Sequence, residues 1–232
     1  IEDQVNNYEY MNFNIGPTLL NWMRYEHPQT YDRIIEADKK SCLRLEGHGN
    51  ALSQVYNHII MPLASPHDRK TQIEWGLRDF EFHFGRKSES IWLAETAINM
   101  DVVVDLIQAG VKYVIMAPTQ FEASRPLVDA DPYKNEGEWV HQGPHEMDTH
   151  RPYRIYPRDF NGKPICEGYL DAFFYDGPLS TAVSFENILK NASVFGDRIA
   201  SSFYDKGRPE LLSIATDGES YGHHDRFGDM CL

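Results

Sequence analysis

The chain has 232 residues, of which 41% are hydrophobic and 12% aromatic, a composition typical of one large globular domain or two small ones. Its formal net charge of −13, from 35 acidic and 22 basic residues, argues against nucleic acid or an anionic membrane surface as a partner. It also lacks any apolar run near the roughly 20 residues that span a membrane. Three widely spaced cysteines favour a reducing compartment, the cytoplasm. Neutral ligands, sugars among them, fit this charge.

The first half of the chain alternates between expected strands and helices. A helix is expected over residues 18–40, with a break at Pro28. Residues 51–61 have helical spacing, and Asp68 is expected to cap a helix that Gly85 ends. The remaining expected elements are strands at 11–15, 91–95 and 111–117 and a helix at 100–109.

The second half begins with an irregular stretch, residues 119–151, where proline, aspartate, glycine and histidine crowd together. The elements expected after it are strands at 153–156 and 168–175, a helix at 184–204 and a last strand at 211–214. Alternating strands and helices are typical of a parallel α/β fold, in which barrel enzymes keep their chemistry at strand ends.

Two of the expected strands end in carboxylates, at Glu95 and at Asp217. A retaining glycosidase needs one carboxylate as nucleophile and another as acid/base, roughly 5–5.5 Å apart. Capping of the following helix is the alternative role for each. Glu219 follows Asp217 by two residues and is expected on the same face of the strand.

Other polar and aromatic residues near the predicted strands are candidates for contacts with a sugar. Trp92 offers a face for stacking, although a core position is the alternative. Hydrogen bonds to sugar hydroxyls, or else ordinary loop and turn roles, are open to His48, Asn50, Gln54, Asp176, Glu219, His223 and His224.

Metal binding is a further alternative for the histidines. One of His223 and His224 could bind zinc together with Asp217, although no recognised ligand spacing is present. A second cluster in the irregular stretch is expected to be surface loop, and consists of His141, His145, His150, Glu146 and Asp148.

Five separated motifs, in order, resemble glycoside hydrolase family 57. IWLAE at 91–95 and TDGESYGHH at 216–224 are similar to its third and fourth conserved regions. GHGNA at 47–51 with QVYNH at 54–58 resembles the second. FNIGPTLL at 13–20 and FFYDGP at 173–178 resemble a bacterial and archaeal subgroup. The first region, a His-x-His-Gln-Pro type motif, is absent, as is the fifth, so the chain is interpreted as a fragment.

The resemblance implies a (β/α)7-type barrel, with parallel strands inside and helices outside, that is incomplete at its N-terminal strand. Residues 1–232 are then one catalytic barrel domain. The resemblance assigns Glu95 as nucleophile and Asp217 as general acid/base of a retaining enzyme that acts on α-glucans or oligosaccharides. It implies no cofactor and no obligatory metal.

Two other functions stay open at this stage. A metal-dependent polysaccharide deacetylase on a related barrel would use Asp217 with His223 or His224 as ligands. A non-catalytic carbohydrate-binding relative would keep the fold without turnover. The sequence does not separate hydrolysis from glucan transfer or branching, and it leaves the oligomeric state open.

Overall fold

The computed structural model describes residues 5–129, 131–134, 137–143, 145–204 and 207–232. Contacts divide the chain into two compact units, which are described separately. Unit 1 comprises Ile1–Val114 and Ile155–Leu170, and unit 2 comprises Ile115–Arg154 and Asp171–Leu232. The expectation of a single barrel domain therefore stays a prediction. Within the described part of the chain, no helix combines the length and apolarity needed to cross a bilayer.

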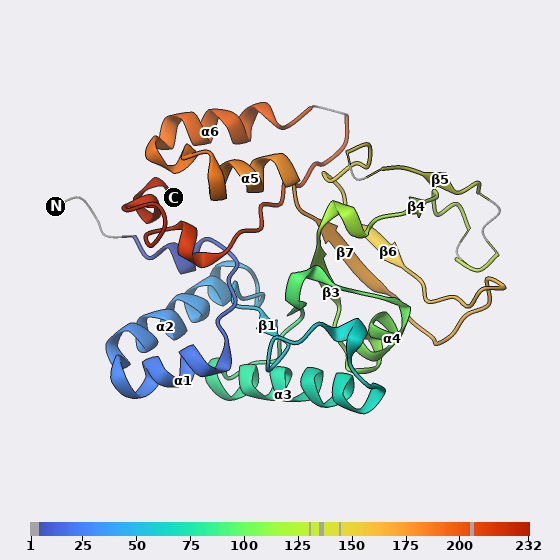
Figure 1. The fold of residues 1–232 in the computed structure, drawn as a ribbon, viewed down its shortest axis with the longest axis horizontal. Coiled ribbons are helices and arrows are strands. Elements are labelled where there is room, and N and C mark those ends of the chain that lie inside the picture. Colours follow the sequence, from blue (N-terminus) through green and yellow to red (C-terminus); the bar gives the residue numbers. More distant parts are fainter. Residues whose placement is uncertain (1–4, 130, 135–136, 144, 205–206) are drawn as a thin grey trace. The chain divides into compact units, whose positions relative to one another are not determined.

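The main helices of unit 1 start at prolines or at polar caps. They are α1 (Pro17–Glu26), α2 (Pro28–Arg44), α3 (Pro66–Phe84) and α4 (Met100–Gln108) (Figure 1). The break at Pro28 is confirmed, as is the end of α3 at Gly85, whose φ of 68° is left-handed. The expected cap is wrong: Ser65 caps α3, and its hydroxyl accepts a hydrogen bond from the backbone N–H of Asp68 at 3.2 Å.

The strands of unit 1 are parallel and short. Strand β1 (Ser53–Gln54) pairs with β2 (Ile91–Trp92). Single parallel bridges add Phe13 beside Ala51 and Ser90 beside Tyr113. The expected strand at 11–15 is thus reduced to one bridge, and the helix expected at 51–61 is wrong.

One hydrophobic cluster joins the strand backbone of unit 1 to its first three helices. Leu20 and Met23 from α1, Ile34 from α2 and Phe80 and Phe84 from α3 are all buried in it, together with Phe13 and Ala51. Ala51, just before β1, is therefore buried against the helices.

Unit 2 holds most of a three-stranded sheet, in the order β3 (Tyr113–Met116), β7 (Leu170–Phe174), β6 (Tyr153–Ile155). The irregular stretch 119–151 contains the antiparallel pair β4 (Ala123–Ser124) and β5 (Val140–His141); its residues 130, 135–136 and 144 lie outside the described ones.

The helix expected at 184–204 is two helices, α5 (Gly177–Phe185) and α6 (Ala192–Ser201), because Asp176 and Asn191 each cap a new start. The last expected strand is also wrong. Residues 211–214 are irregular and join the unit through single hydrogen bonds, including one from Asp176 N–H to the Ser213 carbonyl at 2.7 Å.

The chain therefore has a mixed α/β fold, in which parallel strand pairing alternates with helices, as the sequence predicts. Among the described residues the strands form open sheets of two, three and two strands, and they do not close a barrel.

Candidate functional site

Glu95 lies in a tight turn rather than at the end of a strand. Strand β2 ends at Trp92, and a 3-10 turn follows at Ala94–Thr96. Glu95 adopts φ 55° and ψ 20°, and Thr96 adopts φ 51°. Left-handed torsions at two successive non-glycine residues are unfavourable and tend to occur at functional sites. The Glu95 side chain is exposed, so this turn presents a carboxylate to solvent.

Two of the predicted sugar-binding residues, Gln54 and Trp92, lie side by side. They are Cα partners in the parallel β1–β2 ladder, so their side chains leave the strands on the same face. Gln54 Oε1 accepts a hydrogen bond from Asn14 Nδ2 at 2.8 Å, which orients the amide. Sequence analysis misses Asn14, whose signal is a polar side chain next to the apolar Phe13. Gln54 thus links Asn14 to Trp92, just before the Glu95 turn.

His48 and Asn50 are not brought to this end of the strands. Both precede β1, whereas Gln54 ends β1 and Glu95 follows its parallel neighbour β2. Asn50 is buried, and its Nδ2 donates to the Tyr8 carbonyl at 3.3 Å, which is a structural role. The substrate contacts expected of these two residues stay a prediction that this placement does not favour.

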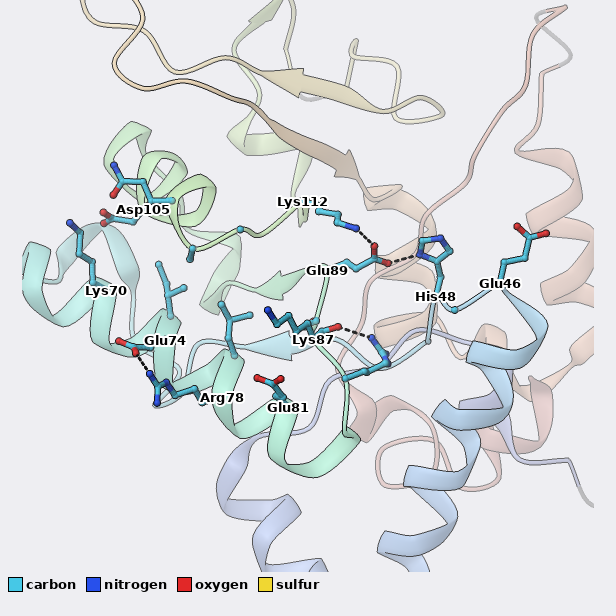
Figure 2. A pocket seen from close by; sticks show the side chains of 18 residues that line it. Glu46, His48, Lys70, Glu74, Arg78, Glu81, Lys87, Glu89, Asp105 and Lys112 are labelled. Carbon is cyan, nitrogen blue, oxygen red and sulfur yellow. Dashed lines mark hydrogen bonds and ion pairs between the residues drawn. The ribbon is translucent and has the colours of Figure 1, made fainter.

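A cavity of about 800 Å³ occupies the amino end of the same strands (Figure 2). It lies between α3, the end of α4 and the segments that precede β1, β2 and β3. Acids and bases alternate around it: Glu46, Lys70, Glu74, Arg78, Glu81, Arg86, Lys87, Glu89, Asp105 and Lys112. Glu95 and Gln54 do not line it, so this cavity is separate from the predicted catalytic end.

Glu89 is the centre of the charge network in this cavity. Its carboxylate lies between His48 Nδ1, at 2.6 Å from Oε2, and the Lys112 ammonium, as Figure 2 shows. Partial burial would raise the pKa of Glu89, but the hydrogen bonds from Lys112 and His48 outweigh it and leave this pKa below its ordinary value. His48 therefore has a partner that accounts for its position without a sugar.

Asp217 in unit 2 also stands at a turn. It occupies the N-cap position of a 3-10 helix at Gly218–Ser220, but its side chain makes no capping hydrogen bond. Its carboxylate is exposed, as is that of Glu219 inside the turn. Because the backbone is not a strand here, the shared face predicted for the two acids does not follow from alternation. The capping alternative for Asp217 is not what the structure has.

The two histidines that follow are held together by the same turn. Their backbone N–H groups both donate to the Glu219 carbonyl, and their rings lie 5.0 Å apart between centroids. Gly222, at φ 135°, supplies the bend between the turn and His223. Both side chains are exposed. Within the described ranges, no group of three or more His, Cys, Asp or Glu side chains is arranged to hold a metal ion.

Asp176 differs from the other two acids because it is committed to a cap. Its Oδ1 accepts a hydrogen bond from the Leu179 N–H at 2.7 Å, at the first turn of α5. The turn role therefore accounts for this residue. In contrast, among the described residues, the carboxylates of Glu95 and Asp217 have no hydrogen-bond or ion-pair partner.

The family model of glycosyl hydrolase family 57 matches residues 2–230 of the chain. The chain belongs to glycosyl hydrolase family 57. No protein of curated function matches the sequence.

Solved structures share the fold of this family 57 chain at low sequence identity. A 4-α-glucanotransferase from Thermococcus litoralis is 17% identical with a TM-score of 0.64, over 97% of this chain and 30% of that one. An exo-type maltose-forming amylase from Pyrococcus sp. ST04 is 18% identical with a TM-score of 0.61, over 93% and 32%. A family 57 branching enzyme from Pyrococcus horikoshii is 16% identical with a TM-score of 0.55, over 91% and 46%.

This chain thus spans about a third to a half of the length of these similar structures. The expected family and the α/β fold class are confirmed.

Proposed function

We propose that this chain carries the catalytic carboxylates of a retaining glycoside hydrolase or transglycosylase that acts on α-glucans. Glu95 is the nucleophile and Asp217 is the general acid/base. The observation that carries the proposal is the state of the two acids: each is exposed in a turn inside a family motif, and neither caps a helix. The names of the similar structures, a glucanotransferase, an amylase and a branching enzyme, support an α-glucan substrate.

The reaction then follows from the two carboxylates. Glu95 attacks the anomeric carbon while Asp217 protonates the departing glycosidic oxygen, which leaves a glycosyl group esterified to Glu95. Asp217, now a carboxylate, takes a proton from water or from an acceptor sugar, and that oxygen displaces Glu95. Each displacement inverts the configuration of the anomeric carbon, so the two together retain it. Gln54 and Trp92 are proposed to bind a sugar beside the nucleophile, and the hydrogen bond from Asn14 to Gln54 and the pairing of Gln54 with Trp92 support this role.

The protein is also proposed to be cytoplasmic. Cys42, Cys166 and Cys231 are all free thiols, which suits a reducing compartment.

Substitution of the two acids tests the assignment. Glu95→Gln should lower kcat on maltoheptaose by at least about 10³-fold, and Asp217→Asn by roughly 10²- to 10⁴-fold. Glu89→Gln is the matched control, because that acid lies at the other end of the strands and should leave kcat within about twofold of wild type.

A substrate with a leaving group that needs no protonation separates the two roles. On α-maltosyl fluoride, Asp217→Asn should recover most of its glycosylation rate, whereas Glu95→Gln should not. The first product, followed by NMR, should have the α configuration. A β product, or an unimpaired Glu95→Gln variant, contradicts the mechanism. Maltoheptaose binding without turnover in the wild type would favour the carbohydrate-binding hypothesis instead.

A further inference from the structure

Trp75 and Tyr56 form a pair of aromatic rings on the surface of unit 1. Trp75 is on α3 and is 50% exposed, although tryptophan is usually well buried. Its ring meets that of Tyr56, in the segment after β1, at 5.5 Å between centroids and an interplanar angle of 85°. This edge-to-face contact holds the indole from one side while half of its surface remains open to solvent.

The pair is fixed by direct contact between α3 and the end of β1. Gly76 lies so close to this strand that a Cβ on it would be 2.1 Å from the Gln54 carbonyl oxygen. The buried Gln72, one helical turn earlier, accepts hydrogen bonds from the backbone N–H groups of Tyr56 at its carbonyl, 3.3 Å, and of Asn57 at its Oε1, 2.7 Å. The two rings are therefore preorganised.

Other exposed aromatic rings of unit 1 differ from Trp75 in what covers them. Trp22, 51% exposed on α1, lies 4.7 Å from the His27 ring, and Phe82 lies 4.8 Å from the Arg24 guanidinium. The partner of Trp75 is instead another apolar ring, set edge-on. Exposed polar side chains follow directly, at Asn57 and His58.

The pair lies at the strand end that carries the proposed chemistry. Tyr56 is two residues beyond Gln54, and the intervening Val55 N–H donates to the Trp92 carbonyl at 3.2 Å. The surface is therefore continuous in the chain with the Gln54–Trp92 pair near Glu95. The chain's net charge of −13 disfavours an anionic polymer here, whereas the apolar C–H faces of glucose fit an open indole.

We propose that Trp75 and Tyr56, with Asn57 alongside, form a docking site for an α-glucan chain outside the catalytic subsites. The proposal rests on the α-glucan substrate of the proposed function. A long glucan chain can contact this pair and the catalytic acids at the same time, whereas maltotriose bound at the catalytic acids gains nothing from the pair, so the site acts on polymer and not on short substrates. Its loss raises the KM for polymer and leaves kcat unchanged.

Binding to soluble starch and to maltotriose tests the site, with all variants made in the Glu95→Gln background so that nothing is turned over. Trp75→Ala should raise the Kd for soluble starch about tenfold in gel affinity electrophoresis and leave maltotriose binding unchanged. Trp75→Tyr should retain most of the affinity. Trp22→Ala, a matched tryptophan of equal exposure, should have no effect.

Several results would overturn the site. Unchanged starch affinity in Trp75→Ala does so, as does an equal loss in Trp22→Ala or an equal loss for maltotriose. If Trp75→Ala does not fold, Tyr56→Ala, with its melting temperature measured, takes its place and should lose starch affinity. The readout is binding, so it remains decisive when the wild type shows no turnover. Absence of turnover in the wild type would contradict the catalytic assignment, whereas the docking site would still be tested by the affinity for soluble starch.

Discussion

Acidic side chains at the two ends of strands β1 and β2 differ in whether they have an ion-pair partner. At the amino end, Glu89 lies between Lys112 and His48, and the buried Asp38 lies against Arg86. At the carboxyl end, Glu95 is exposed on torsions that glutamate seldom adopts, without an ion-pair partner among the described residues. Removing a paired acid leaves its cation without a partner, whereas an unpaired acid on a strained turn is available for chemistry.

The largest stability effect is expected from breaking the buried pair at the amino end. Asp38 is 1% exposed, and it accepts hydrogen bonds from Arg86 Nε and Nη2 and from the Ala51 N–H, each at 2.8 Å. Asp38→Ala leaves the Arg86 charge without its partner. We expect a loss of about 3–5 kcal/mol in the free energy of unfolding, measured by urea titration.

The matched control for this prediction is an exposed pair. Glu74→Ala removes the partner of Arg78, an exposed side chain 2.6 Å away on α3, and should cost less than about 1 kcal/mol. Similar losses in the two variants would mean that burial does not distinguish these pairs.

A gain of stability is expected at the carboxyl end. Glu95→Gly removes a side chain that opposes the left-handed torsion, and should raise the free energy of unfolding by about 1 kcal/mol while abolishing turnover. Glu95→Gln keeps the torsional penalty and should leave stability near that of the wild type. Equal stability of the Gly and Gln variants would show that the turn stores no strain.

The smallest effect concerns pH. The pKa of Glu89 is lowered in the folded protein, so its network stabilises the fold at pH above the ordinary glutamate pKa of about 4.3. This stabilisation is lost as the pH falls below that value and through the folded pKa. The unfolding free energy of Glu89→Gln should therefore fall less than that of the wild type between about pH 5 and pH 3. Parallel curves for the two proteins would contradict this.

Helices with explicit start and stop residues are predictable from this sequence, and the segments around β1 are not. Pro28 and Gly85 act through their own backbone torsions, so their effect is local. Residues 51–61 have helical spacing, yet the Ala51 N–H is bonded to Asp38 and the Val55 N–H to the Trp92 carbonyl. These long-range partners override the local pattern, and no local signal announces them.

The candidate site divides in the same way. Motif residues identify Glu95 and Asp217, but the turns that present them depend on torsions that a strand interpretation does not anticipate. Asp176, Glu95 and Asp217 have the same sequence signature, an acid after an apolar run, and only the structure separates the cap from the two uncommitted carboxylates. Asn14 is missed because its role exists only once it lies beside Gln54.

The close approach at Gly76 has a consequence for redesign of helix α3. A residue there with any side chain would push the helix off the Gln54 carbonyl. In an alanine scan of α3, loss of function at position 76 would therefore reflect a distorted fold and not a lost surface contact. Libraries that vary the exposed side of α3, at Trp75 or Arg78, should therefore keep this glycine constant. The exposed side chains of α3 can therefore be varied freely only while Gly76 is kept.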